Sequence, residues 1–370
     1  MTNNKLNSLI LGFLVSLKLI QPALAEIEKP RGVIRVATFN VALFGSRGGQ
    51  IADRLERGKN PRVRAITDVL IHANADIVLV NELDYDHEGR AANALATILN
   101  ERMPDKEPYL AYPFPTNTGL STGLDLIGSG TTNGPNNAYG FGRFPGQYGF
   151  ALLSRFPMRN SRSFQHFLWK NMPGALLPDA QPGSGDKAFY RQEILDIFRL
   201  SSKNHVDATV DVPGLGPIHL LLSHPTPPVF DGPEYRNGKR NHDEIRLLVD
   251  YIRGQDYLVD DAGRRGGLSE TDLFIVLGDL NADPLAGESY PGAIEQLLRL
   301  HQVQDPEPQG AKGTQTASFG QRLRVDYVLP CDNLRIHDSG VVWYPDTSEF
   351  VRLNNASDHR LVWVDLEVAR

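Results

Sequence analysis

Eight short apolar runs are spread over most of the chain, and they constrain the fold more than any other feature of the sequence. Each run has the length and the apolar content expected of a buried strand. The runs span residues 33–39, 76–80, 149–154, 207–212, 218–223, 273–278, 324–329 and 361–368. Amphipathic stretches lie between them, so the sequence predicts an α/β fold.

Three of the intervening stretches have the spacing of helices. Asn60 is a capping residue, Pro61 occupies the first helical position, and apolar residues recur on one face from there to residue 70. A second helix is expected over residues 245–252 and a third after residues 289–291. The helices are too few for a repeating parallel barrel, so we expect mixed β-sheets with helices outside them.

Residues 1–25 have the pattern of a secretory leader. A polar start with one lysine precedes a mostly apolar run, and residues 23–25 have the small-x-small pattern of a cleavage site. We therefore expect a periplasmic or extracellular protein that is cleaved near Ala25, with residues 26–370 forming one domain. An uncleaved membrane anchor is the alternative, although the apolar run is short for a span. A single cysteine, Cys331, excludes an internal disulfide after export.

The charge of the chain does not favour a protein that holds nucleic acid by bulk attraction. Residues 26–370 carry 36 basic and 44 acidic side chains, a formal charge of −8, because the leader holds two lysines and no acid. Scattered basic residues would either line a local groove for a nucleic-acid backbone or belong to the solvated surface. They are Arg143, Arg155, Arg159, Arg162, Lys170, Arg191, Lys203, Lys239 and Arg240.

Two long stretches, residues 113–147 and 156–190, are rich in glycine, proline or asparagine and predict irregular loops. Loops of this length in a compact domain are often functional, so we expect substrate specificity to reside there. Residues 119–123, GLSTG, match the nucleophile elbow of serine hydrolases. That motif requires a strand before it and a helix after it, and neither pattern is present, so a serine nucleophile is not favoured.

Polar residues recur where the apolar runs end. Asn40, Glu82 and His224 each follow a predicted strand, and the segment GDLNADP places Asp279 and Asn281 behind another. Three more polar residues lie within or just before C-terminal strands, namely Asp326, Asp358 and His359. The start of an antiparallel strand lies at the same edge as the end of its neighbour, so all these side chains are expected to share one rim.

Four carboxylates on one rim, those of Glu82, Asp279, Asp326 and Asp358, would repel one another unless a cation were present. Oxygen ligands of this kind suit Mg²⁺, Mn²⁺ or Ca²⁺, and Mg²⁺ keeps waters and positions for substrate phosphate. The pattern therefore indicates metal-dependent phosphoester chemistry. Taken singly, each residue has a plainer reading as a strand-end cap, a turn residue or a buried histidine.

The ordered set ATFNV, NEL, GFALLSRFP, SHPTPP, GDLNADP, RVDYVLP and SDHRLVWVDL resembles the endonuclease/exonuclease/phosphatase superfamily. The resemblance runs from about residue 34 to residue 366, and the combination of GDLNADP with SDHR is its most specific part. It implies a four-layer sandwich of two packed mixed β-sheets flanked by helices. It also implies hydrolysis of phosphoester bonds with a divalent cation, usually Mg²⁺.

The resemblance also assigns roles to individual residues. It implies that Glu82 is the principal metal ligand, with Asn40 as a second ligand and Asp358 near the cation. The implied catalytic residues are His224, Asp279, Asn281, Asp326 and His359. In this set His359 pairs with Asp326, Asp279 and Asn281 position the attacking water, and His224 lies on the leaving-group side. Lys203 and His205 lie near the place where family members carry a basic residue that contacts phosphate.

The chain departs from the deoxyribonuclease-like members at the partner of His224. Those members pair this histidine with a glutamate from an earlier segment, but Asp125 is the only carboxylate between residues 108 and 156. The acidic partner of His224 is thus an open question at the level of sequence.

Within phosphoester hydrolysis, a nuclease or another phosphodiesterase is our first hypothesis. A phosphomonoesterase or a sphingomyelinase-like phospholipid hydrolase is the alternative, and a non-catalytic binding protein of the same fold is a further one. A sphingomyelinase-like member would expose aromatic residues to a membrane. The nearest candidates are Phe164, Phe167 and Trp169, and we expect these residues to pack in the core instead. We expect a monomer without a stable protein partner.

Overall fold

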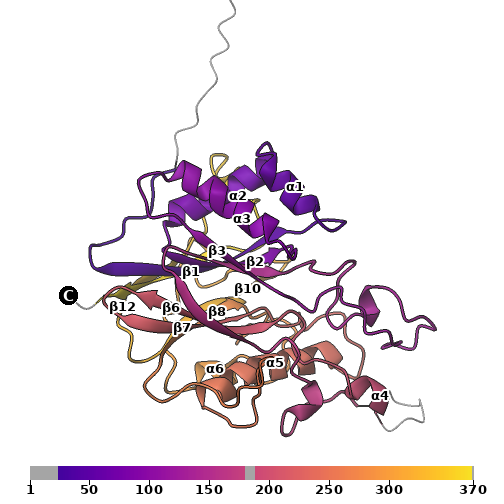
Figure 1. Cartoon of the computed structure of the whole chain (residues 1–370). Coiled ribbons are helices and arrows are strands. Elements are labelled where there is room, and N and C mark those ends of the chain that lie inside the picture. The colour runs from indigo at the N-terminus through magenta and orange to yellow at the C-terminus, as the bar shows by residue number, and fades with distance from the viewer. Residues whose placement is uncertain (1–23, 180–187, 369–370) are drawn as a thin grey trace, which may run out of the picture.

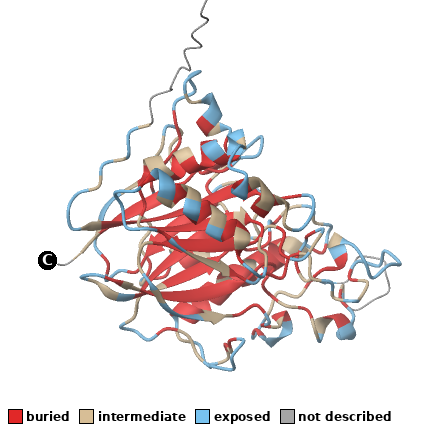
Figure 2. Cartoon of the chain, turned by 45° about the horizontal axis from the view of Figure 1, so that its top comes forward, coloured by how far each residue is buried: buried red, intermediate tan, exposed pale blue. Residues whose placement is uncertain are grey.

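Two mixed β-sheets pack face to face, and helices cover their outer faces (Figure 1). This computed structural model describes residues 24–179 and 188–368. The proposed leader therefore lies outside the described residues except for Leu24 and Ala25. Both sheets are buried between the helices, which expose their outer sides to solvent (Figure 2). The four-layer α/β sandwich expected from the sequence is confirmed.

Six strands form the first sheet and five form the second. The first has the order β12 (Ile336–Val341), β13 (Val362–Glu367), β1 (Val33–Leu43), β2 (Ile77–Leu83), β4 (Phe150–Ser154) and β3 (Leu110–Phe114). The second has the order β11 (Asp326–Pro330), β8 (Leu273–Asp279), β7 (Gly216–Ser223), β6 (His205–Val212) and β5 (Met158–Ser163). A two-stranded ribbon pairs β9 (Ala317–Ser318) with β10 (Arg322–Leu323).

Each large sheet contains one parallel pair, β1 with β2 and β7 with β8, and its other pairs are antiparallel. The parallel strands are buried on both faces, which is why they read as continuous apolar runs. All eight predicted strands are present. The strands that sequence reasoning missed include the sheet edges β3, β5 and β12, whose residues are mostly polar or partly exposed.

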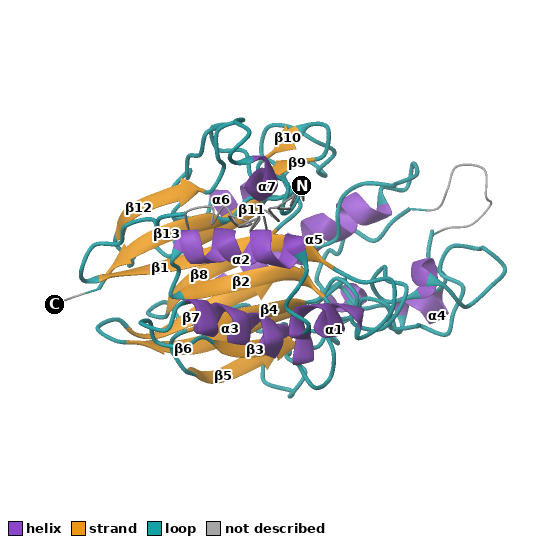
Figure 3. Cartoon of the chain, turned by 90° about the horizontal axis from the view of Figure 1, so that it is seen from above, coloured by secondary structure: helices purple, strands orange, loops and turns teal. Residues whose placement is uncertain are grey.

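The helices fall into two groups, one for each sheet (Figure 1), and the group over the first sheet is seen from above in Figure 3. The first sheet is covered by α1 (Gln50–Glu56), α2 (Pro61–Ala73) and α3 (Arg90–Arg102), and the second by α5 (Arg236–Ile252) and α6 (Glu295–Leu298). Short helices α4 (Gln192–Leu195) and α7 (Val351–Asn354) and the 3₁₀ turns Pro135–Asn137 and Trp169–Asn171 complete the set. None of the helices in the described part of the chain has the length and apolar character that a membrane span needs.

Three local outcomes bear on the sequence predictions. The side chain of Asn60 caps α2 by accepting from the amide nitrogens of Arg62 and Val63, as expected. Helix α5 begins nine residues before the predicted segment, because its first turns are polar yet buried and carry no apolar periodicity. Residues 156–190 are not wholly irregular, because β5 lies within them.

A buried ion pair joins two strands of the first sheet. The guanidinium of Arg35 on β1 contacts the carboxylate of Asp365 on β13, with Nε 2.7 Å from Oδ1 and Nη2 2.8 Å from Oδ2. The same guanidinium donates to the carbonyls of Ile27, Glu28 and Ala73, so it also holds the segment that leads into β1. Because both charges are buried, removing either partner would leave an uncompensated charge in the interior of the protein.

Candidate active site

The topology brings the polar strand ends to one edge of the sandwich. Strands β1 and β2 are parallel and in register at Asn40 and Asn81, so Asn40 and Glu82 lie on neighbouring strands near their carboxyl ends. In the second sheet, β11 runs antiparallel to β8 and Asp326 lies opposite Asp279. The shared rim predicted from the sequence is therefore present.

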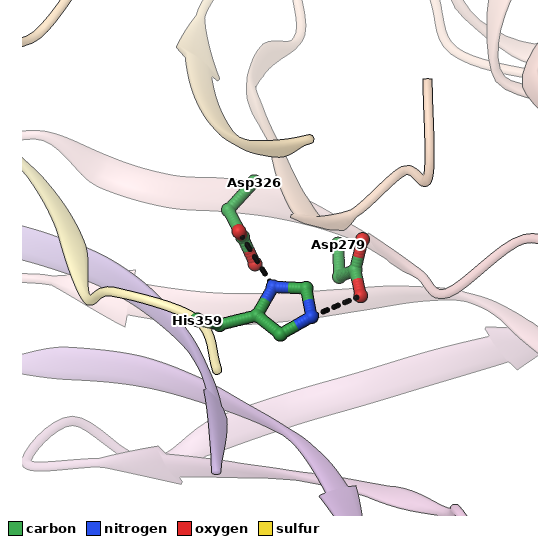
Figure 4. Close-up of side chains that lie close together, drawn as sticks. All are labelled: Asp279, Asp326 and His359. Atoms are coloured by element: carbon green, nitrogen blue, oxygen red, sulfur yellow. Dashed lines mark hydrogen bonds and ion pairs between the residues drawn. The ribbon is translucent and has the colours of Figure 1, made fainter. Parts of the chain in front are cut away.

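His359 lies between two carboxylates (Figure 4). Its Nδ1 is 2.9 Å from Oδ2 of Asp326, and its Nε2 is 3.6 Å from Oδ2 of Asp279. All three side chains are buried. Among the His, Cys, Asp and Glu side chains of the described residues, this is the group whose ligand atoms lie within 4.8 Å of one another.

The two carboxylates hold His359 in its protonated form. Burial alone would lower the pKa of the imidazole, but the charges of Asp326 and Asp279 outweigh burial and raise the pKa to about 10. Burial, together with the neighbouring charge of Asp326, raises the pKa of Asp279 to about 6. The pair thus consists of a persistent imidazolium and a carboxylate that takes up a proton near neutral pH.

The carboxylate of Asp279 on β8 links the two sheets through a hydrogen bond from Asn40 on β1. Its Oδ2 accepts a hydrogen bond of 2.9 Å from Nδ2 of Asn40, and Nε2 of His224 lies 3.4 Å from the same oxygen. Its Oδ1 accepts from the amide nitrogen of Asn281 at 3.0 Å. The side chain of Asn281 donates to the carbonyl of Pro225, which follows His224. These bonds fix the carboxylate without exposing it.

His224 has no acidic partner on its second nitrogen. Its Nδ1 is buried and accepts or donates no hydrogen bond among the described residues. Burial, and then the positive charges of Lys203 and His359, lower the pKa of this histidine well below its ordinary value. His224 is therefore a neutral imidazole, and the departure noted in the sequence is present in the structure.

Glu82 faces a cavity at the rim. It is partly exposed and lines this cavity together with Lys203. Burial raises the pKa of Glu82, while the charges of His359 and Lys203 and a hydrogen bond from Asn40 oppose the increase. A carboxylate that is short of compensating charge and open to a cavity suits a hard divalent cation. Asn40 adjoins Glu82, and Oδ1 of Asn40 accepts a single hydrogen bond among the described residues, of 3.0 Å from the amide nitrogen of Ala42. The donor set of Glu82 and Asn40 thus fits the implied metal.

Two residues of the rim have left-handed backbones. The φ angle is 55° at Glu82 and 53° at Asn281, a region that glycine and, less readily, asparagine adopt. These conformations turn the chain sharply where β2 and β8 end, and they direct both residues toward the rim. Backbone strain of this kind is often found at functional sites.

Asp358 lies at the edge of the constellation. It is exposed, its Oδ1 lies 3.3 Å from the hydroxyl oxygen of Ser357, and its charge contributes to the raised pKa of His359. Asp358 and Glu82 are not members of the compact group formed by Asp279, Asp326 and His359. The structure thus places the residues assigned to the metal around that group rather than inside it.

Lys203 and His205 lie two residues apart where the chain enters β6, and their surroundings differ. Lys203 is buried, lines the cavity with Glu82 and donates to the carbonyl of Pro225 at 3.2 Å. Burial lowers the pKa of Lys203, and the carboxylates of Glu244, Glu82 and Asp279 oppose this. His205 does not line the cavity, its Nδ1 pairs with the hydroxyl of Ser201 at 2.7 Å, and burial lowers its pKa to about 4.

Three residues that sequence reasoning missed support or flank the site. The hydroxyl of Thr316 accepts from the amide nitrogens of Val325 and Asp326, which fixes the start of β11. The hydroxyl of Ser357 donates to the carbonyl of Asn40 at 2.7 Å and so ties the two sides of the rim together. Phe319 is half-exposed, and its ring centroid lies 5.1 Å from that of His359. Ser357 adjoins the SDHR motif, whereas the other two carry no sequence signal.

The serine-hydrolase alternative lacks its structural context. Ser121 is exposed in an irregular segment, where it bridges Ala138, and no strand-to-helix elbow surrounds it among the described residues. The aromatic residues Phe164, Phe167 and Trp169 are buried, so they belong to the core rather than to an exposed membrane contact.

Several solved structures resemble the chain. They include an endonuclease/exonuclease/phosphatase from Beutenbergia cavernae, with 18% identity, a TM-score of 0.49 and coverage of 92% of this chain and 72% of that chain. A family protein from Leptotrichia buccalis has 16% identity, a TM-score of 0.49 and coverage of 90% and 99%. Sphingomyelinase C from Streptomyces griseocarneus has 14% identity, a TM-score of 0.46 and coverage of 91% and 99%.

A search of curated proteins found no match. Residues 37–359 match the sequence pattern of a single family, and the matched region contains every rim residue described above. The chain belongs to the Endonuclease/Exonuclease/phosphatase family.

Proposed function

We propose that the protein is a phosphodiesterase that depends on a divalent cation, Mg²⁺ or Mn²⁺, with Ca²⁺ as a further possibility. Members of its family are phosphoester hydrolases. The observation that carries the proposal is the buried array of Asp326, His359 and Asp279, which adjoins a cavity bordered by Glu82 and Lys203. The array pairs a proton acceptor with a fixed positive charge, which is what hydrolysis of an anionic ester requires.

The cation would be held by Glu82 and Asn40, with Asp358 near it. When bound, it neutralises charge on the phosphoryl oxygens and orients the ester. Lys203 adds a second positive charge on the cavity side of Glu82, and its buried ammonium has only one carbonyl acceptor among the described residues. We assign Lys203 to binding of a phosphoryl oxygen, and we assign no direct contact to His205, which does not line the cavity.

The proton transfers follow from the two pKa shifts. Asp279, with a pKa of about 6, accepts the proton of an attacking water that Asn281 helps to orient. His359, with a pKa of about 10, remains an imidazolium and donates a hydrogen bond from Nε2 to a phosphoryl oxygen. Asp326 fixes the ring through Nδ1 and sustains its charge.

His224 has a different role from His359. Since its imidazole is neutral and its pKa is low, it holds no proton in reserve for release to a leaving group. It does present Nε2 to the same space as Asp279. We therefore assign it to hydrogen bonding with the departing oxygen rather than to full proton transfer.

The basic residues that would favour a nuclease are largely engaged within the protein. Five of the nine pair with carboxylates, namely Arg159, Arg162, Lys170, Arg191 and Lys239. Arg155 and Arg240 donate to backbone carbonyls. Less positive charge is thus free to contact a nucleic-acid backbone, so we place small or lipid-like diesters ahead of DNA and RNA. We also propose that residues 26–370 form one exported, monomeric domain.

The test is a panel of phosphoesters given to the purified protein with Mg²⁺, with Mn²⁺ and with excess chelator. The panel contains plasmid DNA, RNA, sphingomyelin, inositol phosphates, bis(4-nitrophenyl) phosphate and 4-nitrophenyl phosphate. We expect diester cleavage that requires metal and that is lost in Glu82→Ala, Asp279→Ala and His359→Ala proteins that remain folded by circular dichroism. Full activity in chelator would refute the metal role, and inactivity on the whole panel would favour a non-catalytic binding protein.

A further inference from the structure

The cavity beside Glu82 is predominantly apolar. It has a volume of about 300 Å³, which lies within the range of small-molecule sites. Its apolar wall comes from three separate parts of the chain: the loop of residues 113–147, the segment around residue 198 and the turn after β7. The apolar side chains in this wall include Leu126, Ile127, Phe141, Phe198, Val229 and Phe230.

Two polar side chains of the wall are satisfied by the protein itself. Arg240 donates to the carbonyls of Leu200, Tyr139 and Arg199, and its guanidinium stacks on Phe198 at 4.6 Å. The amide of Asn237 donates to the carbonyl of Val229. What the cavity offers a ligand is therefore apolar surface along most of the wall, together with two charged groups, Glu82 and Lys203, at the end next to the catalytic array. It also offers polar atoms of Ser202, Thr226 and Arg236 that have no hydrogen-bond partner among the described residues.

Several apolar side chains at this cavity are exposed. Phe230 is 91% exposed and Phe141 is 53% exposed, and Ile127 lies beside them at 36%. Phe230 also has a left-handed backbone, with φ 61°, so the turn directs a large ring outward at a strained position. Grouped apolar side chains that remain in water beside a polar site usually serve to bind something.

We propose that this cavity binds an apolar substituent of the substrate, an alkyl or aryl group esterified to the phosphate that the array cleaves. The inference rests on the proposed phosphodiesterase function and names the class of diester. The charged end of the cavity and the catalytic rim share Glu82, so a phosphoryl group at the rim carries its substituent directly into the apolar part. A nucleic-acid strand would instead require free cations along the cavity, whereas Arg240 is engaged with three carbonyls and Nε of Arg236 lies 3.7 Å from a carboxylate oxygen of Glu234.

Binding to the metal-free protein tests the proposal without any catalysis. Hexylphosphonate and methylphosphonate carry the same anion and differ only in the apolar group, and neither is an ester that can be hydrolysed. By calorimetry in chelator, we expect hexylphosphonate to bind at least about tenfold more tightly, because each buried methylene strengthens binding several-fold. Equal affinities would overturn the proposal.

Variants at the mouth locate the effect. Ile127→Ser and Phe230→Ser alter exposed side chains, so both proteins are expected to fold, and both should lose most of the preference for hexylphosphonate. Val351→Ser is the matched control, because Val351 is 52% exposed on α7 and does not line the cavity. An unchanged preference in both cavity variants would place the alkyl chain elsewhere and overturn the proposal.

Kinetics then separate the substrate class from the activity itself. Methyl, butyl and hexyl 4-nitrophenyl phosphates share one leaving group, and kcat/KM is expected to rise along the series by at least about tenfold. A flat series with measurable turnover, or faster cleavage of plasmid DNA than of the hexyl ester, would overturn the substrate class and leave the phosphodiesterase intact. Inactivity on every ester together with tighter hexylphosphonate binding would overturn the activity and support the cavity's ligand.

Discussion

Nδ1 of His359 lies 2.9 Å from Oδ2 of Asp326, and both side chains are buried. The two residues are 33 positions apart in the sequence and are held together from two directions. The hydroxyl of Thr316 accepts a hydrogen bond from the amide nitrogen of Asp326, which fixes the start of β11. The hydroxyl of Ser357 accepts a hydrogen bond from the amide nitrogen of His359. The imidazole therefore has one orientation in which its other nitrogen faces Asp279.

Asp326→Asn is expected to reduce kcat by about 10²- to 10⁴-fold, because the amide neither sustains the charge of His359 nor fixes its tautomer. KM should change little, since Asp326 does not face the cavity. Steady-state kinetics on the preferred diester measure both quantities. Asp338→Asn, an exposed substitution on β12, serves as the matched control, and an equal loss in that protein would mean that the effect is not specific to the site.

Chelator-treated protein is expected to keep His359 protonated above pH 8. The pKa of His359 is raised from an ordinary value of 6.5 to about 10, so the folded state holds this proton more tightly than the unfolded state. The stability that it contributes is present in full below pH 6.5 and is lost as the pH rises toward 10. Urea unfolding at several pH values, with NMR titration of the ring, measures this. In His359→Gln the decline in stability over that window should be smaller, and a ring that titrates near pH 6.5 would contradict the assignment.

Glu82→Gln is expected to weaken metal binding by at least about tenfold while leaving the fold intact, because an amide lacks the charge that attracts the cation. Activity measured against Mg²⁺ concentration should shift to higher metal, and calorimetric titration of Mn²⁺ should show the same change without substrate. The control is Glu270→Gln. Glu270 is exposed and lies just before the first residue of β8, whereas Asp279 in the site is the last residue of that strand. An identical metal requirement in the Glu82 variant would remove this residue from the metal site.

Lys203→Met should raise KM by about tenfold or more and lower the affinity for inorganic phosphate, because the buried ammonium would no longer meet the phosphoryl oxygens. The methionine has a similar shape, so the surrounding packing is retained. Lys170, an exposed lysine paired with Asp196, supplies the comparison variant Lys170→Met. If phosphate affinity were the same in both variants, Lys203 would have a structural role only.

Arg35→Met is expected to reduce the free energy of unfolding by about 3–5 kcal/mol, because it leaves Asp365 buried without its partner. The double variant Arg35→Met with Asp365→Leu should recover part of that loss, since no buried charge then remains. Urea denaturation monitored by circular dichroism gives both values. Additive losses would show that the two side chains do not act as a pair.

The central strands of the two sheets were predictable from the sequence, whereas most of the edge strands were not. β1, β2, β7 and β8 are buried on both faces and read as apolar runs, whereas β5 and β12 carry polar residues because one side of each faces solvent. The rim residues were predictable for a related reason, since each one follows an apolar run, lies within one or directly precedes one. Helix α3 was missed because its buried stripe consists largely of alanine, which carries little hydrophobic signal.

The chemistry within the site depended on contacts that no motif encodes. The resemblance implied the pair of His359 with Asp326, but only the structure shows that Asp279 lies at the other nitrogen of the ring and that the two carboxylates together raise the pKa of the imidazole. The apolar cavity is likewise invisible in the sequence, because its wall is assembled from segments about a hundred residues apart. Loop conformation decides such features, and loop residues have no periodicity from which to infer it.

The left-handed backbones at Glu82 and Asn281 predict which substitutions would accumulate in a related protein that had lost its activity. Glycine at either position would relieve about 1 kcal/mol of steric conflict and give a more heat-resistant scaffold. Only a requirement for those two side chains opposes that substitution. A homologue that no longer acted on a substrate would thus be expected to acquire glycine at these positions. The residue at position 82 would then distinguish active homologues from inactive ones.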